Sequence, residues 1–260
     1  MSASATQPFA YPISGKALDF VKIMAVIFMI IDHVNSMILK PIHMDDPLLL
    51  LLGRGAFPLF AYATAAAMIR SGTDKAQNYA TQLFVWGLLT HAISYLTRDT
   101  AAGNVFFTLA FGALLIPYVI ALSQRQKWML YIICAFTNAF PVLCEFGFPG
   151  VLLPSLIYMY LKGDKAALKW IILFAFLMNI PAQYHEFVKI DFIISAIIIL
   201  IFAALMSISS LYLASHLSDK GRYLHRYALH IFYPAHLALF GIIGHLAPIW
   251  GPYFGLLIDK

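Results

Sequence analysis

Long apolar segments, separated by short polar loops, run along almost the whole chain. A window of about 19 residues, which suits a helix that crosses a bilayer, finds nine such segments. They cover residues 17–39, 47–69, 77–97, 104–122, 128–146, 148–161, 167–183, 188–212 and 226–247. The pattern predicts one all-α, polytopic membrane domain over residues 1–260, with about nine transmembrane helices in one bundle after a polar segment, 1–15.

The composition agrees with a chain that lies mostly in lipid. Of its 260 residues, 62% are hydrophobic and 11% are charged, whereas soluble proteins have about 25% charged residues. The net charge of +5 gives no reason to expect a nucleic-acid partner. The polar N-terminal segment lacks the basic start of a secretory signal, so the first apolar segment is expected to stay as a helix.

The lysines and arginines favour one orientation in the membrane. With a cytoplasmic N-terminus, twelve of the 17 fall on the inner side and four on the outer side. The inner ones are Lys16, Lys22, Arg70, Lys75, Arg125, Lys127, Lys162, Lys165, Lys169, Lys220, Arg222 and Arg226. Cytoplasmic loops carry an excess of positive residues, so we predict a cytoplasmic N-terminus and a periplasmic C-terminus in the bacterial inner membrane.

Ionisable side chains interrupt several apolar segments at a similar depth. Asp32 and His33 stand together in VIFMIIDHVNSMI, Arg54 lies in LLGRGAFPLF and His91 lies in the third segment. At ~1.5 Å per residue, His33 and Arg54 lie about 10 Å from the outer ends of their helices. Ionisable groups in spans usually face the bundle interior or a water-filled cavity. A polar cavity in the outer half of the membrane is therefore predicted.

Helix geometry sorts these side chains into faces. Lys22 and His33 are eleven positions apart, which puts them on one face and about 16 Å apart along the axis. Asp32 is turned away from that face. Arg54 is its expected partner, since a buried charge without one is strongly destabilising. Pro58 removes a backbone donor and predicts a kink in the second span.

Three stretches carry a resemblance to a known family. DFVKIMAVIFMIIDHVN, LLGRGAFPLFAY and HIFYPAHLALFG follow in the order and spacing of the TraX family. That family is the inner-membrane group associated with N-terminal acetylation of F-type conjugative pilin. It is similar to the wider transmembrane acyltransferases, some of which have an arginine, ten residues and then an essential histidine. The matching positions here hold Lys22 and His33.

The resemblance implies an acetyltransferase that uses cytoplasmic acetyl-CoA. Lys22 would meet the phosphates of acetyl-CoA, with Arg226 as a further candidate. His33 would be the general base, Arg54 would stabilise the oxyanion or hold the acceptor, and Asp32 would set the electrostatic surroundings. The match in YPAH favours a catalytic place for His236 as well. The implied acceptor is a pilin or another periplasmic group, and no metal is implied.

Other readings stay open. Asp32, His33 and Arg54 at one depth also suit a transporter or proton-coupled carrier, although no inverted repeat is visible. A surface sugar is an alternative acceptor, and a non-catalytic pilus assembly factor is a third class. Cys134 and Cys144 are ten helical positions apart, about 15 Å, which is too far for a disulfide. The sequence does not define the oligomeric state.

Overall fold

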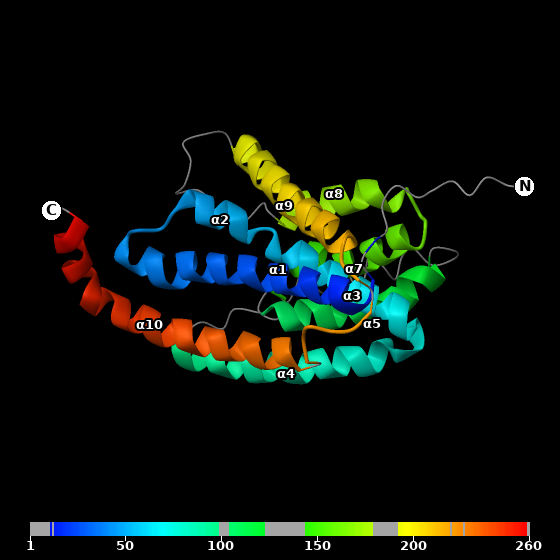
Figure 1. Ribbon diagram of the computed structural model, residues 1–260, viewed down its shortest axis with the longest axis horizontal. Helices are drawn as coiled ribbons and strands as arrows, with labels where there is room; N and C mark the ends of the chain where they lie inside the picture. Colours follow the sequence, from blue (N-terminus) through cyan, green and yellow to red (C-terminus); the bar gives the residue numbers. More distant parts are fainter. Residues whose placement is uncertain are drawn as a thin grey trace, which may run out of the picture.

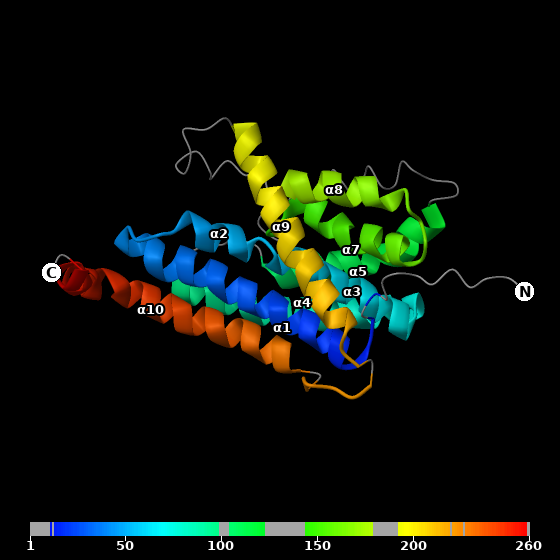
Figure 2. The ribbon, with the colours of Figure 1, turned by 45° about the horizontal axis from the view of Figure 1, so that its top comes forward.

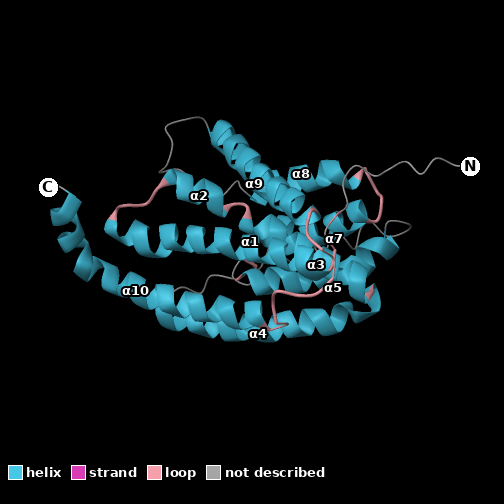
Figure 3. Ribbon diagram, viewed as in Figure 1, coloured by secondary structure: helices cyan, strands magenta, loops and turns pink. Residues whose placement is uncertain are grey.

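The computed structural model describes residues 11, 13–98, 104–122, 144–178, 192–218, 220–225 and 227–258. Throughout these residues the chain forms helices and connecting loops, and none of them forms a strand (Figure 3). The all-α prediction is therefore confirmed.

The helices follow the predicted segments closely. Their bounds are α1 Gly15–His33, η1 Val34–Leu39, η2 Lys40–Ile42, α2 Pro47–Gly53, α3 Ala56–Ser71, η3 Thr73–Lys75, α4 Ala76–Arg98, α5 Val105–Leu122, α7 Gly147–Leu161, α8 Ala167–Met178, α9 Phe192–Ser215 and α10 Ala228–Ile258. Helices occupy every predicted range except 128–146, most of which lies outside the described residues.

The described helices are those of a membrane-type protein. Three of them are long and apolar enough to cross a bilayer, namely Pro47–Ser71 with α2 and α3 taken together, Ala196–Ser215 and Ala228–Leu246. The total of nine spans stays a prediction. The predicted end of the last helix at residue 247 is too early, because α10 continues to Ile258. Prolines are tolerated within apolar helices where the freed backbone groups find other partners.

The first and last helices lie next to one another in the bundle. Both helices run in the same direction, and α10 packs along α4 and against η1 and η2, which continue α1 (Figures 1 and 2). α3 also packs closely against α1. It contacts α5 and α7 in turn, and α8 packs against α7. The fully buried Ala61, Ala65 and Ala66 of α3 allow this close approach, because small side chains let helix backbones meet. The N-terminal and C-terminal helices of the chain therefore belong to the same bundle.

The second predicted span is broken, but not at the proline. α2 ends at Gly53 and α3 begins at Ala56, so the interruption lies at Arg54 and Gly55. Pro58 falls in the first turn of α3, where its missing N–H would have no partner within the helix. The kink predicted at Pro58 is therefore wrong. Gly53 is required here, since a Cβ atom would lie 2.5 Å from the Cβ of Asp32 on α1.

Candidate functional site

Two histidines from opposite ends of the chain meet inside the bundle. His33 is the last residue of α1 and His236 lies on α10, and both side chains are buried. Nδ1 of His33 lies 2.8 Å from Nε2 of His236. The rings are nearly parallel, with an angle of 11° and centroids 5.0 Å apart, which suits a bond in the plane of the rings. The structure therefore unites two residues that the sequence proposed separately.

The hydrogen bonds assign the protons of this pair. Nδ1 of His236 lies 3.1 Å from the carbonyl oxygen of Phe232, which can only accept, so this nitrogen carries a proton. In a neutral His236, Nε2 is then unprotonated and accepts a hydrogen bond from Nδ1–H of His33. The basic lone pair of a neutral His33 is consequently on Nε2. This tautomer is the one that a general base at His33 requires.

Aromatic rings surround the histidine pair. Tyr233 is buried, and its ring centroid lies 6.4 Å from that of His33 and 5.3 Å from that of His236. Phe232 and Phe240 contact His236 at 5.2 Å and 5.6 Å between ring centroids. This apolar shell packs against both imidazoles. The rings also fix the orientation of His236.

An unusual helical segment holds His33 in place. The α-helix widens into a π-helix over Val34–Leu39, directly after His33, and such turns are frequent at functional sites. α10 packs against this segment at Gly244, where a Cβ atom would collide with the carbonyl oxygen of Met37. The buried Asn35 accepts a hydrogen bond of 2.7 Å from the backbone N–H of Asp46. The backbone that follows His33 is therefore held both by α10, at Gly244, and by the start of α2, through Asp46.

Asp32 and Arg54 form the ion pair that the sequence predicts. Oδ1 of Asp32 lies 2.9 Å from Nη2 of Arg54, and the two side chains are 24% and 19% exposed. The pair connects α1 with the break between α2 and α3, where Gly53 leaves room for the aspartate. Asp32 thus orients Arg54, and His33 bonds to His236 instead of to its neighbour Asp32.

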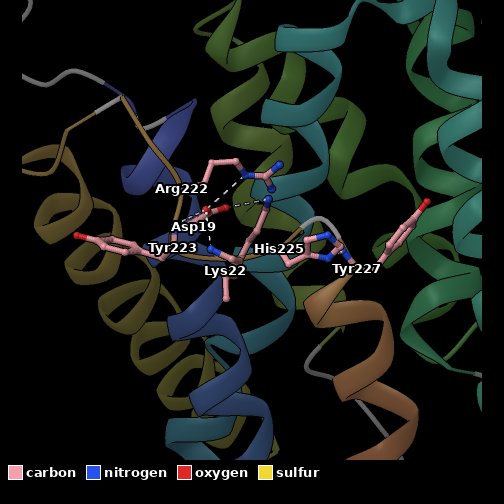
Figure 4. Close-up of polar contacts among 7 residues, drawn as sticks. Asp19, Lys22, Arg222, Tyr223, His225 and Tyr227 are labelled. Atoms are coloured by element: carbon pink, nitrogen blue, oxygen red, sulfur yellow. Dashed lines mark hydrogen bonds and ion pairs between the residues drawn. The ribbon is translucent and has the colours of Figure 1, made fainter.

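A second polar cluster lies near the start of α1 (Figure 4). Asp19 is only 2% exposed, and its carboxylate oxygens lie 3.5 Å from Nζ of Lys22 and 3.7 Å from Nε of Arg222. Oδ2 also accepts hydrogen bonds from the backbone N–H groups of Tyr223 and Leu224, at 3.0 Å and 3.1 Å. One buried carboxylate thereby fixes the segment that leads into α10.

The sequence reasoning overlooked Asp19, although a signal was present. Asp19 stands three positions before Lys22, and residues at this spacing are neighbours on a helix surface. His91 instead packs against Phe107, with ring centroids 6.2 Å apart, and its Nδ1 has no hydrogen-bond partner within the described part of the chain. Arg226 lies outside the described residues. The predicted outer cavity stays a prediction.

Among the described residues, no three His, Cys, Asp or Glu side chains are grouped so that they could hold a metal ion. The described arrangement consists of a buried histidine pair, the Asp32–Arg54 ion pair beside it, and a cluster of cations around Asp19 near the other end of α1. A hydrogen-bonded imidazole with a cation nearby can support acid–base chemistry.

Comparison with known proteins places the chain in a family. The sequence profile described as TraX protein matches residues 17–244. The chain belongs to the TraX family. Protein TraX of Escherichia coli is 25% identical over 167 residues, which cover 63% of this chain and 64% of that protein. Protein TraX of Escherichia coli strain K12 is 23% identical over the same shares. The chain thus spans a little under two thirds of these two relatives.

A further relative of this TraX-family chain carries a different name. The probable fimbrial assembly protein FimC, serogroup H1, of Dichelobacter nodosus is 25% identical over 243 residues, covering 86% of this chain and 96% of that protein. No solved structure matches the chain significantly. Both polar clusters, from Asp19 to His236, lie inside the residues that match the TraX profile.

Proposed function

We propose that this TraX-family chain is a membrane-embedded acetyltransferase. It moves an acetyl group from cytoplasmic acetyl-CoA to an amine on the periplasmic side, the N-terminal amine of a pilin. The observation that carries the proposal is the buried His33–His236 pair, whose hydrogen bonds put the basic lone pair on Nε2 of His33. A purely structural histidine needs no second imidazole to fix its tautomer.

The reaction follows from this tautomer. The neutral amine attacks the thioester carbonyl, a C–N bond forms, and Nε2 of His33 takes the proton that the nitrogen loses. Collapse of the tetrahedral intermediate breaks the C–S bond, and His33 donates the proton from Nε2 to the departing sulfur. Nε2 of His236 accepts a hydrogen bond from Nδ1–H of His33 throughout and stabilises the imidazolium. Arg54, held by Asp32, stabilises the oxyanion or the acceptor.

The two polar clusters suit the two ends of acetyl-CoA. Lys22 and His33 are about 16 Å apart along α1, which is comparable to the length of a pantetheine arm. His230, near the start of α10, lies 5.8 Å from Trp86 of α4 and 5.9 Å from Phe106 of α5 between ring centroids. The nucleotide enters at the cytoplasmic end near Lys22, and the thioester reaches His33.

The acceptor is assigned by analogy with the relatives. The probable fimbrial assembly protein of Dichelobacter nodosus is named for work on fimbriae, and its alignment covers 86% of this chain. A pilus subunit whose N-terminus lies at the periplasmic face would meet the outer ends of α1 and α10 there, in the topology proposed above. A sugar amine or hydroxyl is the alternative acceptor.

The test uses purified protein in lipid nanodiscs with radiolabelled acetyl-CoA. A peptide with a free pilin-like N-terminus should gain the label, whereas the same peptide with a blocked N-terminus should not. His33→Ala should lower the rate by about 10²–10⁴-fold. His216→Ala, at an exposed histidine near the end of α9, is the matched control and should keep the rate.

Two results would contradict the proposal. Absence of label transfer from acetyl-CoA to any amine or hydroxyl acceptor would remove the enzyme class. Proton-coupled uptake of a solute into liposomes, lost in His33→Ala without any acetyl transfer by the parent protein, would establish the carrier instead.

A further inference from the structure

The clue is the position of Asp19, a buried carboxylate close to the cytoplasmic end of α1. Both of its oxygens are occupied, by Lys22 and Arg222 and by two backbone N–H groups of the loop before α10. We call Asp19, Lys22 and Arg222, with the backbone of residues 223–224, the Asp19 clamp. These contacts restrict the Asp19 carboxylate to one position, and they thereby restrict the positions of Lys22 and Arg222 as well (Figure 4).

The clamp carries more positive than negative charge. Arg70, at the end of α3, also acts electrostatically on Lys22, and Nζ of Lys16 lies 5.3 Å above the ring of Tyr223. Two cations therefore lie on the Asp19 carboxylate itself, and two more lie close to the group. The side chains of Lys22 and Arg222 remain 20% and 47% exposed, so both are accessible to a ligand.

We propose that the Asp19 clamp is a binding site for phosphate groups, with Lys22 and Arg222 as its two ligating cations. Arginine offers a planar fork of donors and lysine a compact charge, a combination that suits phosphate oxygens. The phosphate can come from the nucleotide of the co-substrate or from a phospholipid headgroup. The nucleotide source rests on the proposed function. In that case Arg222 and Lys22 would bind the phosphates of acetyl-CoA together at the cytoplasmic end of α1.

Asp19 acts in this site as a positioning residue. Its negative charge opposes an incoming phosphate, yet it holds Arg222 beside Lys22 and ties the loop to α1. Charge alone predicts that Asp19→Asn strengthens phosphate binding, because it removes a negative group. Positioning predicts that the same variant weakens binding, because the two cations repel one another and separate. The two explanations therefore predict opposite changes in phosphate affinity for Asp19→Asn.

The experiment measures binding of adenosine 3′,5′-bisphosphate to the full chain in phosphatidylcholine nanodiscs. Arg222→Ala and Lys22→Ala should each weaken binding about ten-fold or more, as expected for loss of a charged hydrogen bond. Lys220→Ala, which removes an exposed cation from the same loop, is the matched control and should change binding less than about two-fold. Asp19→Asn should weaken binding despite the gain in positive charge.

A second arm identifies the source of the phosphate. Native mass spectrometry of protein from nanodiscs that contain phosphatidylglycerol counts retained lipids. Nucleotide binding that Arg222→Ala weakens supports the nucleotide source, and lipid retention that Arg222→Ala abolishes supports the headgroup source. If neither ligand binds, or if Lys220→Ala weakens binding as much as Arg222→Ala, the clamp is not a phosphate site. Arg222 is half-exposed, so this variant tests the site even if Asp19→Asn fails to fold.

A kinetic comparison separates this inference from the proposed function. Acetyl-pantetheine has the thioester without the nucleotide, so Arg222→Ala should raise the KM for acetyl-CoA about ten-fold and leave that for acetyl-pantetheine unchanged. If the parent protein transfers acetyl from neither thioester but still binds the nucleotide at the clamp, the acetyltransferase proposal fails and the phosphate site stands. If both thioesters react, and Arg222→Ala changes neither KM nor the number of retained lipids, the phosphate site fails alone.

Discussion

The ion pair between Asp32 and Arg54 gives a direct test of how the bundle is held together. Arg54→Gln leaves the carboxylate beside Gly53 without its charged partner. Breaking a fully buried pair costs about 3–5 kcal/mol. Here the side chains keep 24% and 19% of their exposure, so water screens part of the charge. We therefore expect a loss of about 2–3 kcal/mol in the free energy of unfolding.

Thermal unfolding in detergent measures this loss. For a chain of this length a change of 1 kcal/mol shifts Tm by about 2–4 °C, so Tm should fall by about 4–12 °C. Asp32→Asn should give a similar loss, and the double variant should recover most of it because no uncompensated charge remains. Lys40→Gln, at an exposed cation on η2, is the control and should change stability by less than about 0.5 kcal/mol. Losses that simply add in the double variant would refute the pairing.

Three further predictions concern the last helix. His236→Leu removes the acceptor for the Nδ1 proton of His33 and should slow acetyl transfer about ten-fold or more, while His236→Gln, which keeps an acceptor, should retain more activity in the same radiolabel assay. Gly244→Ala should lower Tm, because its Cβ atom meets the carbonyl of Met37, and the crowding costs about 1–3 kcal/mol. A reporter fused after Lys260 should be active only in the periplasm, and one in the α9–α10 loop only in the cytoplasm; the reverse result would invert the topology.

The sequence predicted the helices well because their signal is local. An apolar run of sufficient length forms a helix in lipid wherever it occurs, since each backbone group must be satisfied within the segment. The pairing of Asp32 with Arg54 was also predictable, because two buried charges of opposite sign at one depth have few other solutions. The histidine pair was only half predicted, since each histidine was proposed without its partner.

What the sequence could not provide depends on contacts between distant segments. The π-helix after His33 follows no pattern in VNSMIL, and it becomes understandable only when α10 is seen to pack against it. Likewise, Pro58 predicts a kink at its own position, because proline removes a backbone donor, whereas the helix is interrupted at Arg54 and Gly55. The close contact of Gly53 with Asp32, which helps to place that break, is not visible along the chain. Asp19 was missed because its backbone partners lie on a loop some 200 residues away.

That separation has a consequence for biosynthesis. Asp19 bonds to residues 204 and 205 positions later, and His33 bonds to a residue 203 positions later. At roughly 5–20 residues per second, about 10–40 s of translation separate the emergence of these groups from that of their partners. Throughout this interval Asp19 has Lys22 of the same helix as a partner, but its backbone donors and the histidine partner of His33 have not been synthesised, so both side chains lack their final contacts. The insertion machinery, or the lipid headgroups, must shelter them until the ribosome has nearly finished the chain.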